Sequence, residues 1–270
     1  MSIREPSIRK PAVAGTFYPA EPGALDAEVR AHLASAQVAP LDIARRILIV
    51  PHAGYVYSGP TAADAYRLLQ GTRVRRVVML GPSHYVGFTG LALPGVDVME
   101  TPLGTVGIDA TAVEAIAGSP VVVVSVEAHR REHSLEVQLP FLQVVVPGAL
   151  VVPLLTGAIA PVEGADIVEP LLDDETVLVI SSDLSHYHDT ATARRLDSKT
   201  ANAITRLDGD ALGREAACGL TAVQIAIELA RRAGYRVALL DLRNSGDTAG
   251  PADRVVGYGA FAFGEPVVGE

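Results

Sequence analysis

Three histidines of this sequence stand just beyond short apolar runs that are typical of buried strands. They are His52, His84 and His186, and they follow the runs 47–50, 77–80 and 177–181. In open α/β sheets ligands bind outside the carboxyl ends of the strands, so residues that follow different strands meet at one edge. We therefore expect the three imidazoles to share one polar crevice, although each of them alone would more often be an ordinary turn residue.

Further polar side chains are expected at the same edge. Ser245 and Asp247 follow a run that ends at Leu242, and His133 precedes a predicted helix that begins at Ser134. Neutral imidazole is the commonest metal ligand. Two histidines and a carboxylate suit non-heme iron(II), and three nitrogen or oxygen ligands with a water suit zinc equally well. A histidine that does not bind the metal can act as a general base.

Four tyrosines, Tyr55, Tyr57, Tyr85 and Tyr187, lie beside these histidines in the sequence. Each of them could offer its hydroxyl to a ligand. A buried tyrosine is more often a core anchor with one hydrogen bond, and for any single one we favour that interpretation.

The segment His129–His133 matches the H-x-x-E-H pattern of one group of zinc peptidases. That chemistry needs both histidines on one face of a helix, whereas this segment is predicted to be a loop before the helix cap Ser134. Two arginines inside it would also place positive charge beside a metal, so the peptidase interpretation is disfavoured. Cys218 opens a predicted helix, where the dipole could lower the pKa of its thiol, but inert burial is the commoner outcome for a lone cysteine.

The composition narrows the classes of function. Lys and Arg number 22 against 31 Asp and Glu, and the resulting net charge of −9 disfavours nucleic acid as a partner. A single cysteine excludes an intrachain disulfide and fits a reducing compartment. The N-terminus lacks the apolar stretch of a signal peptide, and no apolar run approaches the ~20 residues of a membrane span. We expect a cytoplasmic protein that binds neither nucleic acid nor membranes.

Apolar runs alternate with segments of helical periodicity, which predicts an α/β fold with a mainly parallel central sheet and helices on both faces. Predicted strands cover 46–50, 76–80, 90–93, 104–107, 120–126, 150–155, 175–181, 235–242 and 255–263. Predicted helices cover 25–33, 61–69, 109–117, 134–146, 162–172, 190–207 and 219–233. Pro60 is expected in the first turn of its helix, and Pro140 is expected to kink or split another. Residues 1–270 are predicted to form one domain, with an extended arm over 1–21.

With these residues assembled, the sequence closely resembles the Memo family, also called protein B of the AmmeMemoRadiSam system. The resemblance runs through nearly the whole chain. The matching motifs are PAVAGTFYP at 11–19, PHAGY at 51–55, YSG at 57–59, GPSH at 81–84, EHSLEVQLPF at 132–141, SDLSHY at 182–187, NSGD at 244–247 and VGYGA at 256–260.

The resemblance implies a fold similar to the class III extradiol dioxygenases, which are non-heme iron enzymes. On that pattern His52 and His84 are metal ligands, with iron(II) or copper expected ahead of zinc. The third ligand is a carboxylate in the dioxygenases and a cysteine in human-type Memo proteins, whereas this sequence places Ser245 there. A serine hydroxyl is a weak ligand, so Asp247 or water is the alternative.

The same resemblance implies that His186, with Asp183 nearby, occupies the acid–base position. The remaining candidates come from their place in the sequence beside these residues, and His133 is expected alongside as a catalytic residue. The candidates for binding a ligand are Tyr55, Tyr85, Tyr187 and Glu136.

Two hypotheses of function follow. The first is a metal-dependent oxidoreductase with a histidine-lined crevice. The second is a non-catalytic module whose crevice binds a small molecule, a peptide or a partner protein. The resemblance implies radical-SAM and AMMECR1-type proteins as partners, and ring cleavage does not follow from the fold alone.

Overall fold

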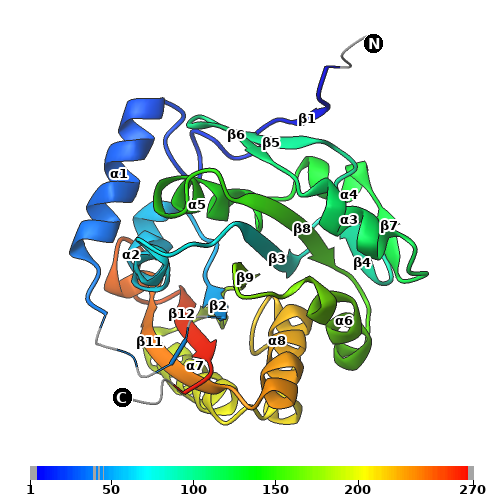
Figure 1. Cartoon of the computed structure of the whole chain (residues 1–270). Helices are drawn as coiled ribbons and strands as arrows, with labels where there is room; N and C mark the ends of the chain where they lie inside the picture. Colours follow the sequence, from blue (N-terminus) through cyan, green and yellow to red (C-terminus); the bar gives the residue numbers. More distant parts are fainter. Residues whose placement is uncertain (1–4, 39–40, 42, 45, 267–270) are drawn as a thin grey trace.

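The computed structural model describes residues 5–38, 41, 43–44 and 46–266, which form a layered α/β structure (Figure 1). The strands are β1 (Ile8–Arg9), β2 (Ile47–Val50), β3 (Arg76–Pro82), β4 (Leu91–Leu93), β5 (Val98–Thr101), β6 (Gly104–Gly107), β7 (Val122–Val124), β8 (Leu150–Thr156), β9 (Thr176–Ser181), β10 (His186–His188), β11 (Arg236–Asn244) and β12 (Val255–Gly264). The α-helices are α1 (Pro22–Ser35), α2 (Tyr55–Tyr66), α3 (Ala110–Ala117), α4 (Val126–Arg130), α5 (Leu139–Val145), α6 (Pro161–Val168), α7 (Thr190–Thr205) and α8 (Leu220–Ala233).

The central sheet of the described residues runs in the order β10-β12-β2-β9-β3-β8-β4-β7, and β11 pairs with β12. The prediction of an α/β fold is confirmed, but the prediction of a mainly parallel sheet is wrong. Strands β2, β9, β3 and β8 pair in parallel, whereas β12 is antiparallel to β2, β10 and β11, and β4 is antiparallel to β8. The connection from β11 to β12 is too short for a helical crossover, and short connections join antiparallel strands.

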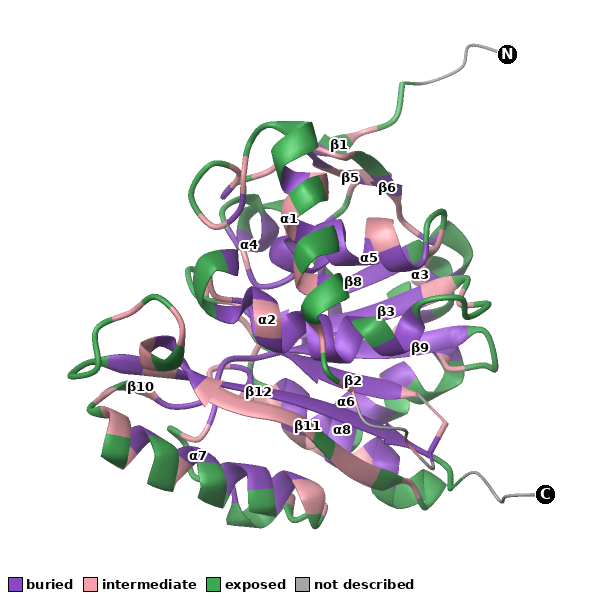
Figure 2. Cartoon of the chain, turned by 90° about the vertical axis from the view of Figure 1, so that its left-hand side faces the viewer, coloured by how far each residue is buried: buried purple, intermediate pink, exposed green. Residues whose placement is uncertain are grey.

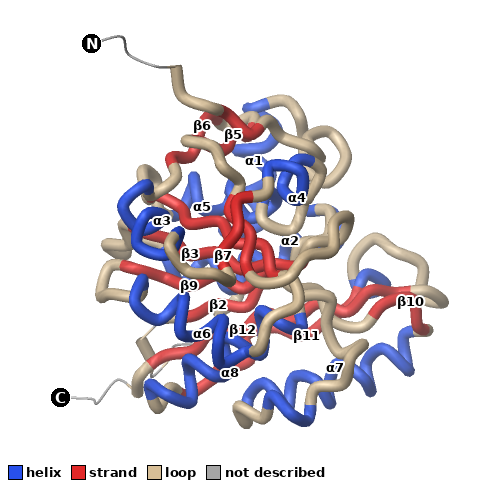
Figure 3. Tube along the Cα trace, turned by 90° about the vertical axis from the view of Figure 1, so that its right-hand side faces the viewer, coloured by secondary structure: helices blue, strands red, loops and turns tan. Residues whose placement is uncertain are grey.

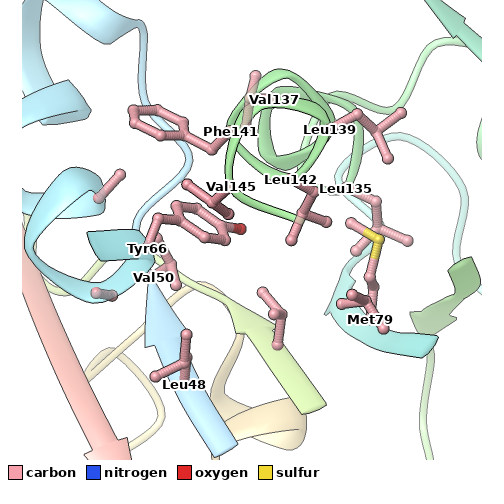
Figure 4. Close-up of a cluster of buried hydrophobic side chains, with 14 of the residues drawn as sticks. Leu48, Val50, Tyr66, Met79, Leu135, Val137, Leu139, Phe141, Leu142 and Val145 are labelled. Atoms are coloured by element: carbon pink, nitrogen blue, oxygen red, sulfur yellow. The ribbon is translucent and has the colours of Figure 1, made fainter. Parts of the chain in front are cut away.

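Alternate residues of the parallel strands face two separate hydrophobic clusters. Val77 and Met79 of β3 belong to the cluster that includes α1, α2 and α5, whereas Val78 and Leu80 belong to the cluster that includes α6 and α8. Figure 2 shows the buried strands between these helical layers, and Figure 4 shows Met79 and Leu48 in the cluster to which the side chains of α5 belong. Because these strands are buried on both faces, their sequences are continuous apolar runs.

Two predictions about proline-containing helices had different outcomes. Pro140 does split its helix, since a 3-10 turn (Glu136–Gln138) gives way to α5 with Pro140 in its first turn. The predicted helix 61–69, however, begins earlier, at Tyr55, and Pro60 lies inside α2. Burial of Tyr55 against Phe141 favours this earlier start, because tertiary packing overrides the lost backbone hydrogen bond.

The described part of the N-terminal arm is fixed to the body by the buried carboxylate of Glu136. Arg9 forms an ion pair with it, the backbone N–H groups of Ala12 and Val13 donate to it at 2.8 and 3.0 Å, and the Tyr18 hydroxyl donates at 2.6 Å. Every oxygen of Glu136 is therefore used inside the protein. The expectation that Glu136 binds a ligand is not met by its position, because its side chain has no exposed surface.

Candidate metal centre

Three histidines converge at the carboxyl ends of the parallel strands. His52 follows β2, His84 follows β3, and His133 lies between α4 and the 3-10 turn that precedes α5. One potential ligand atom from each lies within 4.8 Å of the other two. The rings of His84 and His133 are stacked with centroids 4.6 Å apart, and the His52 ring stands edge-on to both at 5.2 and 5.4 Å. We call these residues the three-histidine cluster.

A close approach of two chain segments brings His133 to this edge. The Ser134 hydroxyl donates to the carbonyl of Pro82 at the end of β3, and the Ser181 hydroxyl donates to the carbonyl of Ser134. A Cβ atom on Gly81 would lie 2.8 Å from Leu135 and 3.0 Å from the Ser134 hydroxyl. A larger residue at position 81 would therefore displace the Leu135 or Ser134 side chain that packs on the end of β3.

The carboxylate of Glu132 orients His84. Burial opposes its ionisation, but hydrogen bonds from the His84 side chain and from the His84 and Ser134 backbones lower the pKa of Glu132 to about 2. An ionised carboxylate only accepts, so His84 Nδ1, at 2.8 Å, must carry the proton and donate. The lone pair of His84 therefore lies on Nε2, as in the carboxylate–histidine pairs that orient metal ligands.

The hydrogen bonds of Ser181 fix the tautomer of His52 in the same way. The single proton of the Ser181 hydroxyl is donated to the Ser134 carbonyl, and Gln138 Nε2 donates to the hydroxyl oxygen at 2.8 Å. His52 Nδ1, 2.9 Å from that oxygen, must then be a donor as well. The lone pair of His52 consequently lies on Nε2.

Cys218 contacts this lone pair from within the protein. Its sulfur lies 3.2 Å from His52 Nε2, and the backbone N–H of Asp183 donates to it at 3.2 Å. Burial, and next the nearby carboxylate of Asp183, raise the pKa of the Cys218 thiol to about 12. The thiol is thus protonated. Its single proton can be donated to the carbonyl of Asp183, 3.6 Å away, which leaves the lone pair on His52 Nε2 open to a metal ion. The structure agrees with inert burial and not with a thiol activated by the helix dipole.

Burial also keeps two rings of the cluster, those of His52 and His133, neutral. It lowers the pKa of His52 to about 3, with a further contribution from His84, and it lowers the pKa of His133 to about 4, with a further contribution from His52. Both rings are therefore unprotonated near neutral pH and can offer a lone pair to a cation.

The cluster lies at the base of a cavity of about 490 Å³ that we call the histidine cavity. Asp183 and His186 line the same cavity, so the structure brings together His52, His84, His133, Asp183 and His186. The expectation that strand-end histidines share one crevice matches this geometry. Other lining residues are Thr16, Phe17, Tyr57, Tyr187, Ser245, Arg254 and Tyr258.

His186 presents one free nitrogen in this cavity. Its Nδ1 lies 2.8 Å from the carbonyl of Leu184, which can only accept, so Nδ1 is the donor and Nε2 carries the lone pair. The next residue, Tyr187, has φ of 63°, in the left-handed region that non-glycine residues rarely adopt, and the pairing of β10 with β12 is irregular here. The strand that carries His186 is thus locally irregular at the site.

The two candidates for a third ligand differ in position. Ser245 lines the histidine cavity, and its hydroxyl accepts the backbone N–H of Val256 at 3.0 Å. Asp247 does not line it, because its carboxylate accepts the backbone N–H of Asn244 and forms an ion pair with Arg194 at 2.7 Å. Among the His, Cys, Asp and Glu side chains that the structure describes, the residue that joins His52 and His84 is His133.

Three expected ligand-binding tyrosines differ in position. Tyr55 lies in the core, where its hydroxyl donates to the carbonyl of Val137 at 2.6 Å. Tyr187 is 64% exposed at the cavity, with the Arg254 guanidinium 4.5 Å from its ring centre. Tyr85 is 52% exposed beside His84, and Arg131 lies 5.1 Å from its ring centre. Only Tyr187 of the three lines the histidine cavity in the described part of the chain.

The geometry rules out the zinc peptidase arrangement. His129 lies on the short helix α4, and its Nε2 is 2.7 Å from the carbonyl of Ala92, so it is turned away from His133. The expected loop is in part a helix, but the two histidines of the pattern do not share a site.

Sequence reasoning missed several residues of the site. Glu132 orients His84 and also accepts the backbone N–H of His133, and the buried Tyr258 and the arm residue Phe17 line the cavity. Phe17 stacks obliquely on His133 with ring centres 4.7 Å apart. All three residues lie inside the motifs that match the Memo family, and this is the signal in the sequence that could have identified them.

The donor set fits a metal ion. Three imidazoles within reach of one another, two with Nε2 lone pairs fixed by hydrogen bonds at Nδ1, suit iron(II), copper or zinc. The open volume of the cavity would leave further coordination positions of a bound metal ion free for a substrate.

Comparison with known proteins shows the family to which the chain belongs. The family model described as Memo-like protein matches residues 9–262, and the chain belongs to this family. A MEMO1 family protein of Aquifex aeolicus is 36% identical over 95% of this chain and 99% of its own length. MEMO1 family proteins of Thermoplasma volcanium and Archaeoglobus fulgidus are likewise 36% identical, over 94% and 95% of this chain and 97% and 99% of their own lengths.

In the described part of the chain, no helix combines the length and the apolar character that crossing a membrane would require.

Proposed function

We propose that this Memo-like protein is a metal-dependent oxidoreductase in which His52, His84 and His133 hold iron(II) or copper. The observation that carries the proposal is the convergence of three imidazoles in a cavity that also contains the two acid–base candidates His186 and Asp183. The implied resemblance to class III extradiol dioxygenases, in fold and in chemistry, favours redox chemistry over hydrolysis. Ring cleavage is not part of the proposal.

The roles of the residues follow from their hydrogen bonds. A bound iron or copper ion would supply redox chemistry that zinc lacks. Nε2 of His186 is a proton acceptor in the same cavity, because Nδ1 donates to Leu184. Tyr258 is almost fully buried there, and burial raises the pKa of its phenol, so it stays protonated and can donate a hydrogen bond to a substrate. Phe17 and Tyr187 provide apolar surface that would shield a bound substrate from water.

Anaerobic titration with iron(II), copper and zinc tests the proposal. The wild-type protein should bind one ion of iron(II) or copper per chain, and the His52→Ala/His84→Ala variant should lose this binding. The His32→Ala/His188→Ala variant removes two histidines outside the cluster and should bind as the wild type does. Dioxygen consumption by the iron-loaded or copper-loaded protein with a reductant should follow metal content. Equally weak metal binding by the wild type and by the His52→Ala/His84→Ala variant would contradict the proposal.

The second candidate is a binding module for a peptide or for radical-SAM and AMMECR1-type proteins. The observation that favours it is the exposure of Tyr85 and Tyr187 near the histidine cavity, each with an arginine over its ring. Exposed aromatic and arginine side chains are the types that dominate binding interfaces. A pull-down with the two partner types from the same cell, repeated with Tyr187→Ala, tests it. Absence of both partners would count against this role.

A further inference from the structure

A second cavity, of about 520 Å³, lies on the other side of β10 from the histidine cavity. One face of α7, the segment 211–216 and two residues of the β10 segment line it, and Figure 3 shows α7 beneath β10 at the edge of the molecule. It shares no lining residue with the histidine cavity in the described part of the chain. We call it the basic cavity.

Three cationic side chains, Arg195, Lys199 and Arg214, line the basic cavity against one carboxylate, Glu215. None of the three cations has an ion pair or a side-chain hydrogen bond among the residues that the structure describes. This differs from the neighbouring Arg194, which pairs with Asp247. In a chain of net charge −9, a cluster of unpaired cations is a local exception.

The spacing on α7 strengthens this observation. Arg195 and Lys199 are four residues apart on the helix, so their like charges lie on one face and repel each other. Thr192 and Thr200 share that face and also line the cavity. An anion held between these side chains would remove the repulsion.

A buried hydroxyl without a well-formed hydrogen bond belongs to a residue that lines the same cavity. Ser185 is 2% exposed and lines the cavity, and its Oγ lies near the Asp197 carboxylate without a well-formed hydrogen bond. Buried polar atoms are nearly always hydrogen-bonded in native proteins, and the exceptions call for a ligand or water. A ligand oxygen would satisfy this hydroxyl.

From these observations we propose that the basic cavity binds a small organic molecule that carries a phosphate group. Two or three cations and hydroxyl donors match the charge and the three terminal oxygens of a phosphate monoester. The cavity is larger than a phosphate alone requires, and the apolar side chains of Leu196, Ala211 and Ala216 would contact the organic part.

The position of this cavity links it to the first one. Ser185 and His188 line the basic cavity, whereas His186 and Tyr187, between them in the chain, line the histidine cavity. A phosphate held by Ser185 and His188 would therefore restrain the segment that carries His186. The site does not depend on whether the histidine cavity binds a metal.

Calorimetric titration of the metal-free protein with glycerol 3-phosphate and with adenosine 5′-monophosphate tests the proposal. At least one of the two should bind, and the Arg195→Gln/Lys199→Gln variant should bind it at least tenfold more weakly. Ser185→Ala should weaken it severalfold. The Arg206→Gln/Arg231→Gln variant removes the same charge from exposed arginines elsewhere and should bind as wild type does. Circular dichroism and thermal unfolding confirm that each variant is folded.

Several outcomes would overturn it. If the wild type binds neither phosphate ester, there is no such site. If both charge variants weaken binding equally, only general surface charge acts. If inorganic sulfate or malate binds as tightly as the phosphate esters, the cavity does not select a phosphorylated molecule. If the wild-type protein binds no metal, by contrast, only the oxidoreductase proposal is contradicted.

Discussion

At the scale of single residues, the properties of the candidate metal centre depend on which ring nitrogens carry protons. Glu132 and Ser181 each force a neighbouring Nδ1 to donate, so that His84 and His52 both keep their lone pairs on Nε2. These two partners are as important to the site as the histidines themselves, because they hold the rings in one orientation before any ion arrives.

The first prediction concerns Glu132. The Glu132→Gln substitution removes the charge that fixes the proton on His84 Nδ1, and we expect it to weaken metal binding about 10-fold to 100-fold. Titration with iron(II) or copper measures this change. Glu127→Gln alters an exposed carboxylate of the same segment and should leave the affinity unchanged. An unaltered affinity in Glu132→Gln would show that Glu132 does not orient a ligand.

The second prediction concerns Cys218. Because its pKa is raised to about 12, the thiolate fraction at pH 8 should be about a thousandfold below that of an ordinary cysteine, and alkylation should be correspondingly slow. The rate of reaction with iodoacetamide, compared with the same chain in denaturant, measures it. A rate in the folded protein close to that in denaturant would contradict the buried, protonated thiol.

At this scale the sequence predicted part of the site. His52, His84 and His186 could be found because each follows an apolar run, which locates a strand end without knowledge of the contacts. The grouping of His133 with two of them could not be found in the same way, since it depends on Gly81 and on the two serine hydroxyls that bind its segment. The misassignment of Glu136 has the opposite cause: its motif was noticed, but its partners on the arm are more than 115 residues away.

At the scale of elements, the histidine cavity is formed by the N-terminal arm and β10 together with the carboxyl ends of the parallel strands. The arm supplies Thr16 and Phe17, and β10 supplies His186. Both are short, polar and irregular, so neither shows the periodicity by which the long strands and helices were predicted. The helices that alternate with the long strands could be predicted because they do show hydrophobic periodicity. In α8, for example, the apolar residues recur at helical spacing.

The third prediction is made at this scale. Glu136→Ala would leave Arg9 buried without its partner and the Ala12 and Val13 N–H groups without an acceptor, and we expect it to lower the free energy of unfolding by about 3–5 kcal/mol. Denaturant unfolding measures this, and limited proteolysis should cut the arm sooner than in wild type. Glu163→Ala on α6 is the exposed control. A loss below about 1 kcal/mol would contradict the anchoring role.

At the scale of the whole molecule, the sheet joins a parallel centre to an antiparallel edge. The parallel strands place His52 and His84 at one end, and the antiparallel strands β11 and β12 bring Ser245 and Tyr258 to the same end. Sequence patterns predicted the parallel centre because its strands are buried on both faces. They did not predict the antiparallel edge, since the direction of β12 depends on the short connection after β11 and not on hydrophobic periodicity.

The fourth prediction concerns the dependence of stability on pH in metal-free protein. Burial lowers the pKa of His129 to about 4, although its hydrogen bond to Ala92 opposes the shift, whereas the unfolded chain should titrate near 6.5. The unfolded state therefore binds more protons between these values. The stabilising contribution is complete above about pH 6.5 and is lost as the pH falls towards 4, by about 1.4 kcal/mol per pH unit for one histidine.

Chemical denaturation at pH 7, 6, 5 and 4.5 checks this dependence. His129→Gln should show a shallower loss of unfolding free energy than wild type, and His188→Gln, which lies outside the core, should show the same slope as wild type. Identical slopes in all three proteins would mean that His129 is not buried in its neutral form.

The central claim is that His133, and not Asp247, completes the metal centre with His52 and His84. The most direct measurement is the iron(II) affinity of His133→Asn compared with Asp247→Asn under anaerobic conditions. We expect His133→Asn to lose affinity at least about a hundredfold, since the removal of a ligand should cost no less than the removal of an orienting partner, and Asp247→Asn to bind as the wild type does. Normal binding by His133→Asn together with a large loss in Asp247→Asn would contradict the account.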